Sequence, residues 1–353
     1  MSNSTIRSIC LVGILLSAVC CSSDSNTRNS NVLPPTGTGG YPSEYPGGPS
    51  STTSDWTTSA NPNQNVYGVW GTGPSDVWAV GYQNNILHWD GTAWSSSLTG
   101  TTGELHGVWG TGRNDVWAVG RQILHWDGAS WTPTTANIVY TLYAVWGSGP
   151  NDVWAGGGSS GSSGFIMHWD GSTWTEQAIT SLEQINAFWG SAANDVWAVG
   201  GEGNGLILHW DGQAWTKVLE GSSTLALFGL LGIWGNSASD VWAVGEQNIA
   251  HWDGSQWSLQ SCSAYSWTVA TGTSDVCPMG FTGVWGSSAN DVWAVGAGGG
   301  VYGFVEHWNG LAWTMESNGM QNGLTGVWGS SASDIWAVGP GILSGGFILH
   351  HKQ

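Results

Sequence analysis

The sequence predicts an all-β fold: a seven-bladed β-propeller of four-stranded antiparallel blades, its ring closed by an N-terminal strand. Three observations predict it: a tryptophan-rich unit recurs down the chain, each copy contains short apolar pieces, and the last copy lacks a piece that the start of the chain supplies. The copies begin at Trp70, Trp109, Trp146, Trp189, Trp234, Trp285 and Trp328. Repeats of about 40 residues, with strand-like pieces bounded by Gly, Asn, Asp and Ser, are typical of propeller blades.

The first copy shows the four expected strands of a blade. Strand A is expected at 66–71, strand B at 76–81, strand C at 86–90 and strand D around Trp94. Asp90-Gly91 lies between strands C and D, and this dipeptide is typical of a two-residue hairpin with positive φ at the glycine. Each blade is therefore expected to be an antiparallel meander.

The two ends of the chain together complete the last blade. The seventh copy stops at Gln353, soon after its strand C, so its strand D is missing. Trp56 lies 14 residues before Trp70, close to the interval of 15 between Trp94 and Trp109. Trp56 is therefore expected to supply the missing strand, which removes an exposed sheet edge. A solenoid is the alternative, but it favours capping repeats over a split one.

The variation in length falls at one end of the blades. The tryptophans of strands A and B are 8 residues apart in all seven copies, whereas the B–C and D–A connections differ from copy to copy. In a meander these two connections share one face, and loops on a rigid scaffold often carry function. The alternative is that loops such as 157–164 are merely tolerated insertions.

The composition excludes one class of partner. The net charge is −18 with only 6 Lys and Arg, which argues against nucleic acid because such binding needs a basic surface. No cofactor motif is present, and we expect a monomer. The chain divides into a lipoprotein-type signal peptide at 1–20, a Ser/Pro/Gly-rich disordered tether at 21–53 and the propeller at 54–353.

The N-terminal segment has the features of an export signal. Arg7 precedes an apolar run, 9–19, that is too short to span a bilayer. The run ends at Cys20 and Cys21, which resembles a bacterial lipoprotein signal with Cys20 as the lipidated residue. Cys21 is the alternative site, and ordinary secretion is the alternative fate. The protein is thus expected outside the cytoplasm, lipid-anchored to a bacterial membrane or cell surface, or secreted.

The propeller has two cysteines, and they flank its longest connection. Cys262 and Cys277 are expected to form a disulfide that fixes this loop, with two buried thiols as the alternative. Of the 28 tryptophans, only Trp267 lies outside the repeat positions. The repeat tryptophans are expected to pack between blades, whereas Trp267 and its neighbour Tyr265 are candidate ligand contacts.

Histidine recurs at one position of strand C, and aspartate at the start of strand B. The histidines are His88, His125, His168, His209, His251, His307 and His350. Equivalent positions on different blades are too far apart to share a metal ion, so no metal site is expected. The expected role is structural: a hydrogen bond within each blade, for example Asp76 with His88 and Asp240 with His251, which would resemble the buried polar network of WD-repeat blades.

The repeat unit resembles the BNR/Asp-box group of propellers, in particular blades of the photosystem II assembly-factor type. The likeness rests on Trp-Ala-Val-Gly at 78–81, Ile-Leu-His at 86–88 and Asp-Gly-Thr-Ala-Trp at 90–94. The Asp-Gly turn is one residue shorter than in that group and follows Trp89. The resemblance implies the fold but not an activity, since propellers host many functions.

We therefore expect a non-catalytic binding or scaffold protein that engages a protein or glycan through its variable face. The alternative is a secreted glycosidase or lyase using loop carboxylates such as Glu202, Glu246 and Glu306. A sialidase needs three arginines, and the propeller has only Arg113 and Arg121. A third possibility is a structural part of a larger surface assembly.

Overall fold

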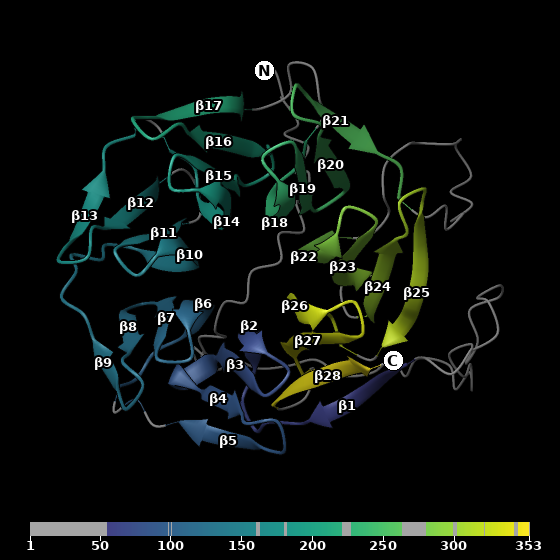
Figure 1. The fold of residues 1–353 in the computed structure, drawn as a ribbon, viewed down its shortest axis with the longest axis horizontal. Coiled ribbons are helices and arrows are strands. Elements are labelled where there is room, and N and C mark those ends of the chain that lie inside the picture. Colours follow the sequence, from purple (N-terminus) through teal and green to yellow (C-terminus); the bar gives the residue numbers. More distant parts are fainter. Residues whose placement is uncertain are drawn as a thin grey trace, which may run out of the picture. The chain divides into compact units, whose positions relative to one another are not determined.

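Residues 55–97, 99, 101–159, 163–179, 182–220, 227–262, 280–298, 302–320, 322–341 and 345–352 are described by the computed structural model. They form seven sheets of four strands each. Every sheet is antiparallel and follows the order A-B-C-D from the centre of the ring outward (Figure 1). The predicted seven-bladed propeller is confirmed.

The strands of each blade are as follows. Blade 1 contains β2 (Val66–Gly73), β3 (Asp76–Gly81), β4 (Ile86–Trp89) and β5 (Trp94–Ser97), and blade 2 contains β6 (Leu105–Gly112), β7 (Asp115–Gly120), β8 (Ile123–Trp126) and β9 (Trp131–Pro133). Blade 3 contains β10 (Thr141–Gly149), β11 (Asp152–Ser159), β12 (Ser163–Trp169) and β13 (Trp174–Gln177), and blade 4 contains β14 (Ile185–Ala192), β15 (Asp195–Gly200), β16 (Leu206–Trp210) and β17 (Trp215–Glu220). Blade 5 contains β18 (Leu230–Ser237), β19 (Asp240–Gly245), β20 (Asn248–Trp252) and β21 (Trp257–Gln260), and blade 6 contains β22 (Gly280–Ser288), β23 (Asp291–Gly298), β24 (Tyr302–Trp308) and β25 (Trp313–Met320). Blade 7 contains β26 (Gly326–Ser331), β27 (Asp334–Pro340), β28 (Gly346–Lys352) and β1 (Trp56–Ala60), and a 3-10 turn, η1 (Tyr82–Asn84), follows β3.

Blade 7 is assembled from both ends of the propeller, as predicted. Strand β1 pairs antiparallel with β28, and Trp56 lies opposite His351 in the register. The two strands lie side by side at the outer edge of the ring in Figure 1. No blade in the described part of the chain therefore lacks its fourth strand.

The meander gives the ring two unlike faces. The A–B and C–D turns lie at one end of every blade, which we call the turn face. The B–C and D–A connections lie at the other end, which we call the loop face. Neighbouring blades meet through their first strands, so β2, β6, β10, β14, β18, β22 and β26 surround the centre (Figure 1). The first residues of these strands consequently lie at the loop face beside the central opening.

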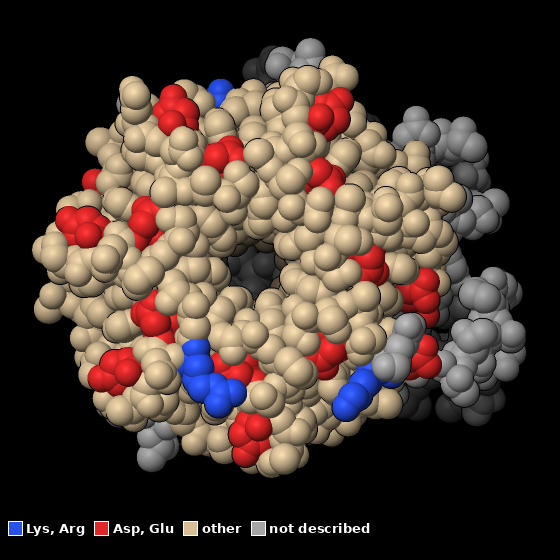
Figure 2. Space-filling model, viewed as in Figure 1, with Lys and Arg blue, Asp and Glu red and all other residues tan. Residues whose placement is uncertain are grey.

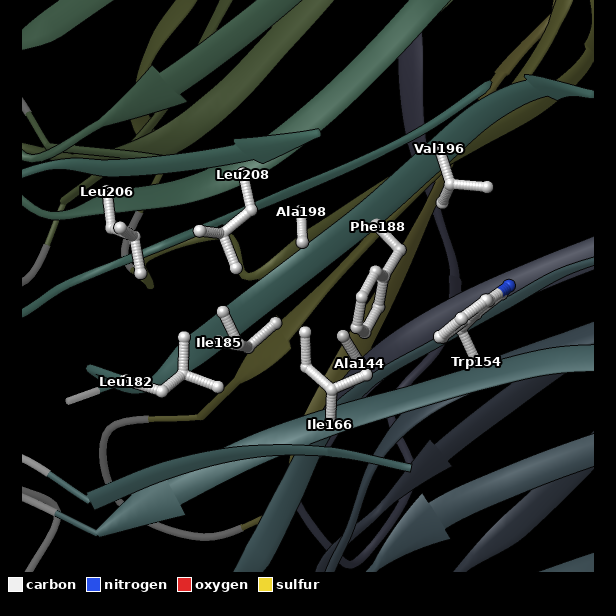
Figure 3. Packing of buried hydrophobic residues seen from close by; sticks show 10 residues of the cluster. All are labelled: Ala144, Trp154, Ile166, Leu182, Ile185, Phe188, Val196, Ala198, Leu206 and Leu208. Atoms are coloured by element: carbon white, nitrogen blue, oxygen red, sulfur yellow. The ribbon is translucent and has the colours of Figure 1, made fainter. Parts of the chain in front are cut away.

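Apolar side chains fill the space between consecutive sheets. Ile166 of blade 3 packs against Ile185 and Leu208 of blade 4, within a cluster in which all three are fully buried. Figure 3 shows these side chains interdigitating between the sheets. Each such side chain contributes about 1.5–3 kcal/mol by leaving water. A similar cluster of buried side chains lies at each of the other six junctions between blades, so the apolar packing continues around the ring.

The repeat tryptophans form the outer part of each junction. Trp78 of β3 lies 5.3 Å from Trp126 and 5.4 Å from Trp131 of the next blade, measured between ring centroids. The second pair has the edge-to-face geometry that aromatic rings prefer. The expectation that these tryptophans pack between blades is confirmed at this junction. The same arrangement of three tryptophans recurs at the next junction, where Trp117 contacts Trp169 and Trp174.

One junction departs from the pattern. In blade 7, His351 occupies the strand C position that is tryptophan in the other six blades. Its ring lies between Trp56 and Trp293, at centroid distances of 5.2 Å and 5.1 Å. The His351 side chain is buried, and both of its ring nitrogens lack a hydrogen-bond partner among the described residues.

The C–D turn corrects one expectation. Trp89 pairs with Trp94, so four residues, 90–93, form the loop instead of two. Asp90 Oδ1 accepts hydrogen bonds from the amides of Thr92, at 2.8 Å, and Ala93, at 2.9 Å. These bonds, with a backbone bond from Asp90 N to Ala93 O at 3.3 Å, stabilise the longer turn. The positive φ predicted for the glycine is confirmed, since Gly91 has φ of 97°.

The predicted signal peptide and tether, 1–20 and 21–53, lie outside the described residues and remain predictions. The compact unit begins at Ser54. Within the described part of the chain, no helix has the length and apolar character needed to cross a bilayer.

Candidate functional site

The predicted aspartate–histidine pairs occur in all seven blades. His88 Nε2 lies 2.6 Å from Asp76 Oδ1, and His251 Nε2 lies 2.7 Å from Asp240 Oδ1. The other five pairs have the same atoms at 2.6 Å. Each pair joins strands B and C of one blade at the turn face, so these residues stabilise the scaffold.

The pair is part of a larger network. Thr72 Oγ1 donates to Asp76 Oδ2, and the ring of His88 stacks on Trp78 with centroids 4.0 Å apart. A serine or threonine four residues before the aspartate has this role in six blades. Blade 5 has Asn236 there, and Asp240 Oδ2 is buried without a hydrogen-bond partner among the described residues.

These networks do not assemble into a metal centre or a nucleophile. Each histidine is bonded to the aspartate of its own blade, and no group of three or more His, Cys, Asp or Glu suited to a metal ion occurs among the described residues. In the six networks that contain a hydroxyl, it donates to the carboxylate and not to the imidazole, so the histidine does not activate it.

The predicted ligand loop is only partly placed. Tyr265, Trp267 and Cys277 lie outside the described residues, so their roles remain predictions. Cys262 is half-buried beside the cluster that contains Trp242. The proposed disulfide remains a prediction as well.

A second candidate site emerges from the tyrosines. Tyrosines with described side chains occur at four positions, all at the loop ends of blades 1 and 3: Tyr67, Tyr82, Tyr140 and Tyr143. Tyr82 and Tyr140 are exposed at 41% and 37%. Together with His106 of blade 2, we call these residues the tyrosine patch.

The inner part of the patch is a continuous row of rings across three blades. Tyr67 stacks on His106, with centroids 5.2 Å apart and planes 16° apart. His106 in turn lies 5.1 Å from Tyr143. Tyr67 and His106 are the second residues of β2 and β6, and Tyr143 is the third of β10, so the row borders the central opening on the loop face.

A β-bulge positions each member of the row. In each of these blades the register of the A–B pairing shifts by one residue, and the unpaired residue is Tyr67, His106 or Tyr143. Such a bulge re-aims the side chain of the extra residue. Blades 4 and 6 use the same position differently: Asn186 Nδ2 donates to Leu230 O at 2.8 Å, and Thr282 Oγ1 donates to Leu324 O at 2.7 Å. Aromatic rings in blades 1–3 thus occupy a position that in blades 4 and 6 carries a hydrogen bond to the next blade.

The imidazole in this row is uncharged at neutral pH. Burial, followed by the positive charge of Arg121, lowers the pKa of His106 to about 4. Glu104 Oε2 lies 3.6 Å from His106 Nε2, which is beyond hydrogen-bond range. The negative charge of Glu104 is therefore not neutralised by His106.

The two inner tyrosines are protonated and sit in a negative environment. Burial raises the pKa of Tyr143, the charges of Glu202 and Glu104 raise it further, and the charge of Arg121 and a hydrogen bond with Thr141 act against this rise. Burial also raises the pKa of Tyr67, with Glu104 adding to the effect. Figure 2 shows a hollow at the centre of the ring, and the excess of acidic over basic side chains on the face drawn there agrees with the net charge of −18 for the whole chain.

The residues of a sialidase-like site are not brought together. Arg113 lies in an A–B turn, with its Nε 3.9 Å from Asp76 Oδ2, whereas Arg121 follows β7 at the loop face. A strand of six residues, about 20 Å long, separates the two arginines. Of the candidate loop carboxylates, Glu306 is fully buried within β24, while Glu202 and Glu246 are exposed.

Sequence reasoning missed the tyrosine patch. One signal was present: Tyr67, His106 and Tyr143 each lie three residues before the strand A tryptophan of their own copy. The closeness of Tyr67, His106 and Tyr143 depends on three blades meeting at the inner strands, which spacing within one blade does not reveal.

Comparisons with solved structures give the same fold. YCF48 bound to D1 peptide matches with a TM-score of 0.62 and 16% identity over 86% of this chain and 97% of that chain. YCF48 from Cyanidioschyzon merolae matches with a TM-score of 0.59 and 16% identity, over 84% of this chain and 98% of that chain. The WD40 repeats of RRP9 match with a TM-score of 0.65 and 9% identity, over 85% of this chain and 98% of that chain. Likeness at such identities shows the propeller fold alone. No protein family and no curated protein matches the sequence.

Proposed function

We propose that this protein is a non-catalytic binding propeller that holds a protein partner on its loop face. The observation that carries the proposal is the tyrosine patch. Tyrosine is among the residues that most often dominate binding energy at protein interfaces, since it combines a large apolar ring with a polar tip. Tyr82 and Tyr140 present such rings to solvent.

The contrast between the two faces supports the proposal. The turn face repeats one hydrogen-bond network in every blade, which suits a scaffold. The loop face differs from blade to blade, and the tyrosines whose side chains are described there gather on blades 1 and 3. The YCF48 structure with a D1 peptide is a propeller of similar fold with a bound peptide, which makes a protein partner the first choice over a glycan.

The test compares retention of partners by three forms of the purified full chain. Tyr67→Ala/Tyr143→Ala removes the inner rings, and Leu311→Ala removes a side chain that is 89% exposed in a C–D turn. Proteins retained by the wild type should be lost by the double variant and kept by Leu311→Ala. Equal retention by all three forms, or retention of glycans alone on a carbohydrate array, would contradict the proposal.

We further propose that the propeller lies outside the cytoplasm and is tethered through lipidated Cys20. The support is the apolar run 9–19 followed by Cys20 and Cys21. Changing Cys20→Ser together with Cys21→Ser should release the protein from the membrane fraction of a bacterial host. Continued membrane fractionation of the double variant would show that another anchor holds it.

A further inference from the structure

We infer that the tyrosine patch receives a lysine- or arginine-bearing segment of the partner. The inference rests on the proposed function and names the chemistry that the site would recognise. It is carried by two features together: the aromatic rings at the mouth of the central opening and the carboxylates around them.

Two carboxylates lie next to the inner row. Glu104 Oε2 is 3.6 Å from the neutral His106 ring, and the charges of both Glu104 and Glu202 act on Tyr143. Because His106 carries no positive charge at neutral pH, it does not offset them. Arg121 acts on Tyr143 in the opposite sense, so this ring lies in the field of two negative groups and one positive group.

Two more carboxylates extend this negative region over blades 4 and 5. Glu183 Oε2 accepts a hydrogen bond from the Glu202 amide at 3.3 Å, so the two acidic residues are neighbours. Glu246 follows β19, and its amide donates to Gly229 O at 3.1 Å. The negative side chains of this region are thus Glu104, Glu183, Glu202 and Glu246. Among the described residues, the positive side chain on this part of the loop face is Arg121.

A cationic side chain fits both features. An ammonium or guanidinium group is attracted to the face of an aromatic ring, and the apolar stem of Lys or Arg packs on ring carbons. Complementary charge also steers the approach of a partner and selects against acidic ones. With a net charge of −18, the chain repels an acidic segment at long range.

The experiment uses a short, fluorescently labelled lysine-rich peptide and its glutamine and glutamate analogues as probes. Fluorescence anisotropy with the full chain gives the dissociation constant of each peptide at low and high salt. The lysine peptide should bind more tightly than both analogues, and added salt should weaken it. Binding of the glutamate peptide in preference to the lysine peptide would overturn the inference.

Charge variants separate the patch from the general acidity of the protein. Glu104→Gln and Glu202→Gln should each weaken lysine-peptide binding about two- to fivefold, the usual range for a partly exposed ion pair. Arg121→Gln should strengthen binding, because it removes a like charge. Glu176→Gln, on the exposed outer strand β13, removes the same charge elsewhere and should leave binding unchanged.

The outcomes distinguish this inference from the proposed function. Equal weakening by Glu104→Gln and Glu176→Gln would mean that the peptide binds through net charge alone, which overturns the inference. If no peptide binds while partner retention still depends on Tyr67 and Tyr143, the cationic class is wrong and the binding function stands. If retention does not depend on those tyrosines either, both fail.

Discussion

At the scale of single residues, the repeat acts as its own control. Six of the seven copies of one polar network have a hydroxyl donor, and the copy with Asn236 leaves Asp240 Oδ2 buried without a partner among the described residues. A buried acceptor without a hydrogen bond costs about 1–3 kcal/mol. Blade 5 is therefore less well stabilised at its turn end than its neighbours.

Completing this network should stabilise the protein. Asn236→Ser places a hydroxyl where the other six blades have one, so the midpoint of thermal unfolding should rise, with a gain of about 1 kcal/mol. Thr72→Ala creates the same deficiency in blade 1 and should lower the midpoint. A lower midpoint for Asn236→Ser would show that the hydroxyl contributes nothing to Asp240.

His351 makes the closing blade sensitive to pH. Burial lowers the pKa of His351, while Asp55 and Glu316 act to raise it and His307 and His350 to lower it. Because the pKa in the folded protein is below the usual 6.5, the unfolded chain binds the proton more readily. The contribution of His351 to stability should therefore fall as the pH drops below about 6.5.

Replacing His351 with tryptophan should remove this sensitivity. In the other blades a tryptophan occupies the position, and Trp126 Nε1, for example, donates to Arg113 O at 3.2 Å. The His351→Trp variant should lose less stability than the wild type between neutral and mildly acidic pH, because it has no group that takes up a proton there. Identical pH profiles of the unfolding midpoint in the two proteins would contradict this.

At the scale of the structural element, the C–D turns show what spacing can and cannot predict. The sequence predicted the strands around the turn and the positive φ of Gly91. It did not reveal the loop length, because the side chain of Asp90 satisfies the amides of a four-residue loop. Hydrogen bonds to its carboxylate lower the pKa of Asp90 to about 2. The bond from the Thr92 hydroxyl has the largest effect, and those from the amides of Ala93 and Thr92 follow.

Two glycines of blade 1 should respond differently to alanine. Gly91→Ala places a Cβ on a residue with φ of 97° and 2.7 Å from Ser75 Cβ, which should cost about 1–2 kcal/mol. Gly73→Ala meets no atom within 4 Å and serves as the control. Denaturant midpoints measure both, and equal midpoints for the two variants would show that the turn tolerates a side chain.

The tyrosine patch lies at the limit of what the sequence shows. Aspartate–histidine pairing follows from spacings inside one blade, and it was predicted. The row formed by Tyr67, His106 and Tyr143 needs three blades and three bulges, and none of these contacts is close in sequence. Long-range arrangement in the ring, and not local propensity, creates this candidate site.

At the scale of the whole molecule, β1 is expected to hold the ring closed. A chain shortened to begin at residue 62 loses Trp56, which contacts Trp293 with centroids 6.0 Å apart, and leaves β28 with an unpaired edge. It should unfold at a lower temperature and associate with itself, since exposed edges pair with other chains. A chain that begins at residue 54 keeps β1 and should behave as the full chain, with light scattering and thermal unfolding as the measurements.

The closure by β1 also sets the order in which the ring can form. Thr57 Oγ1 donates to His350 O at 3.2 Å across 293 positions of the sequence, whereas the other six sheets join strands that follow one another along the chain. Bringing distant segments together costs chain entropy before any contact is gained, so pairings of this kind form slowly. The six other blades can form from strands that are neighbours in the sequence, while β1 has no partner until β28 is present. The final step of folding therefore joins the first strand to the last.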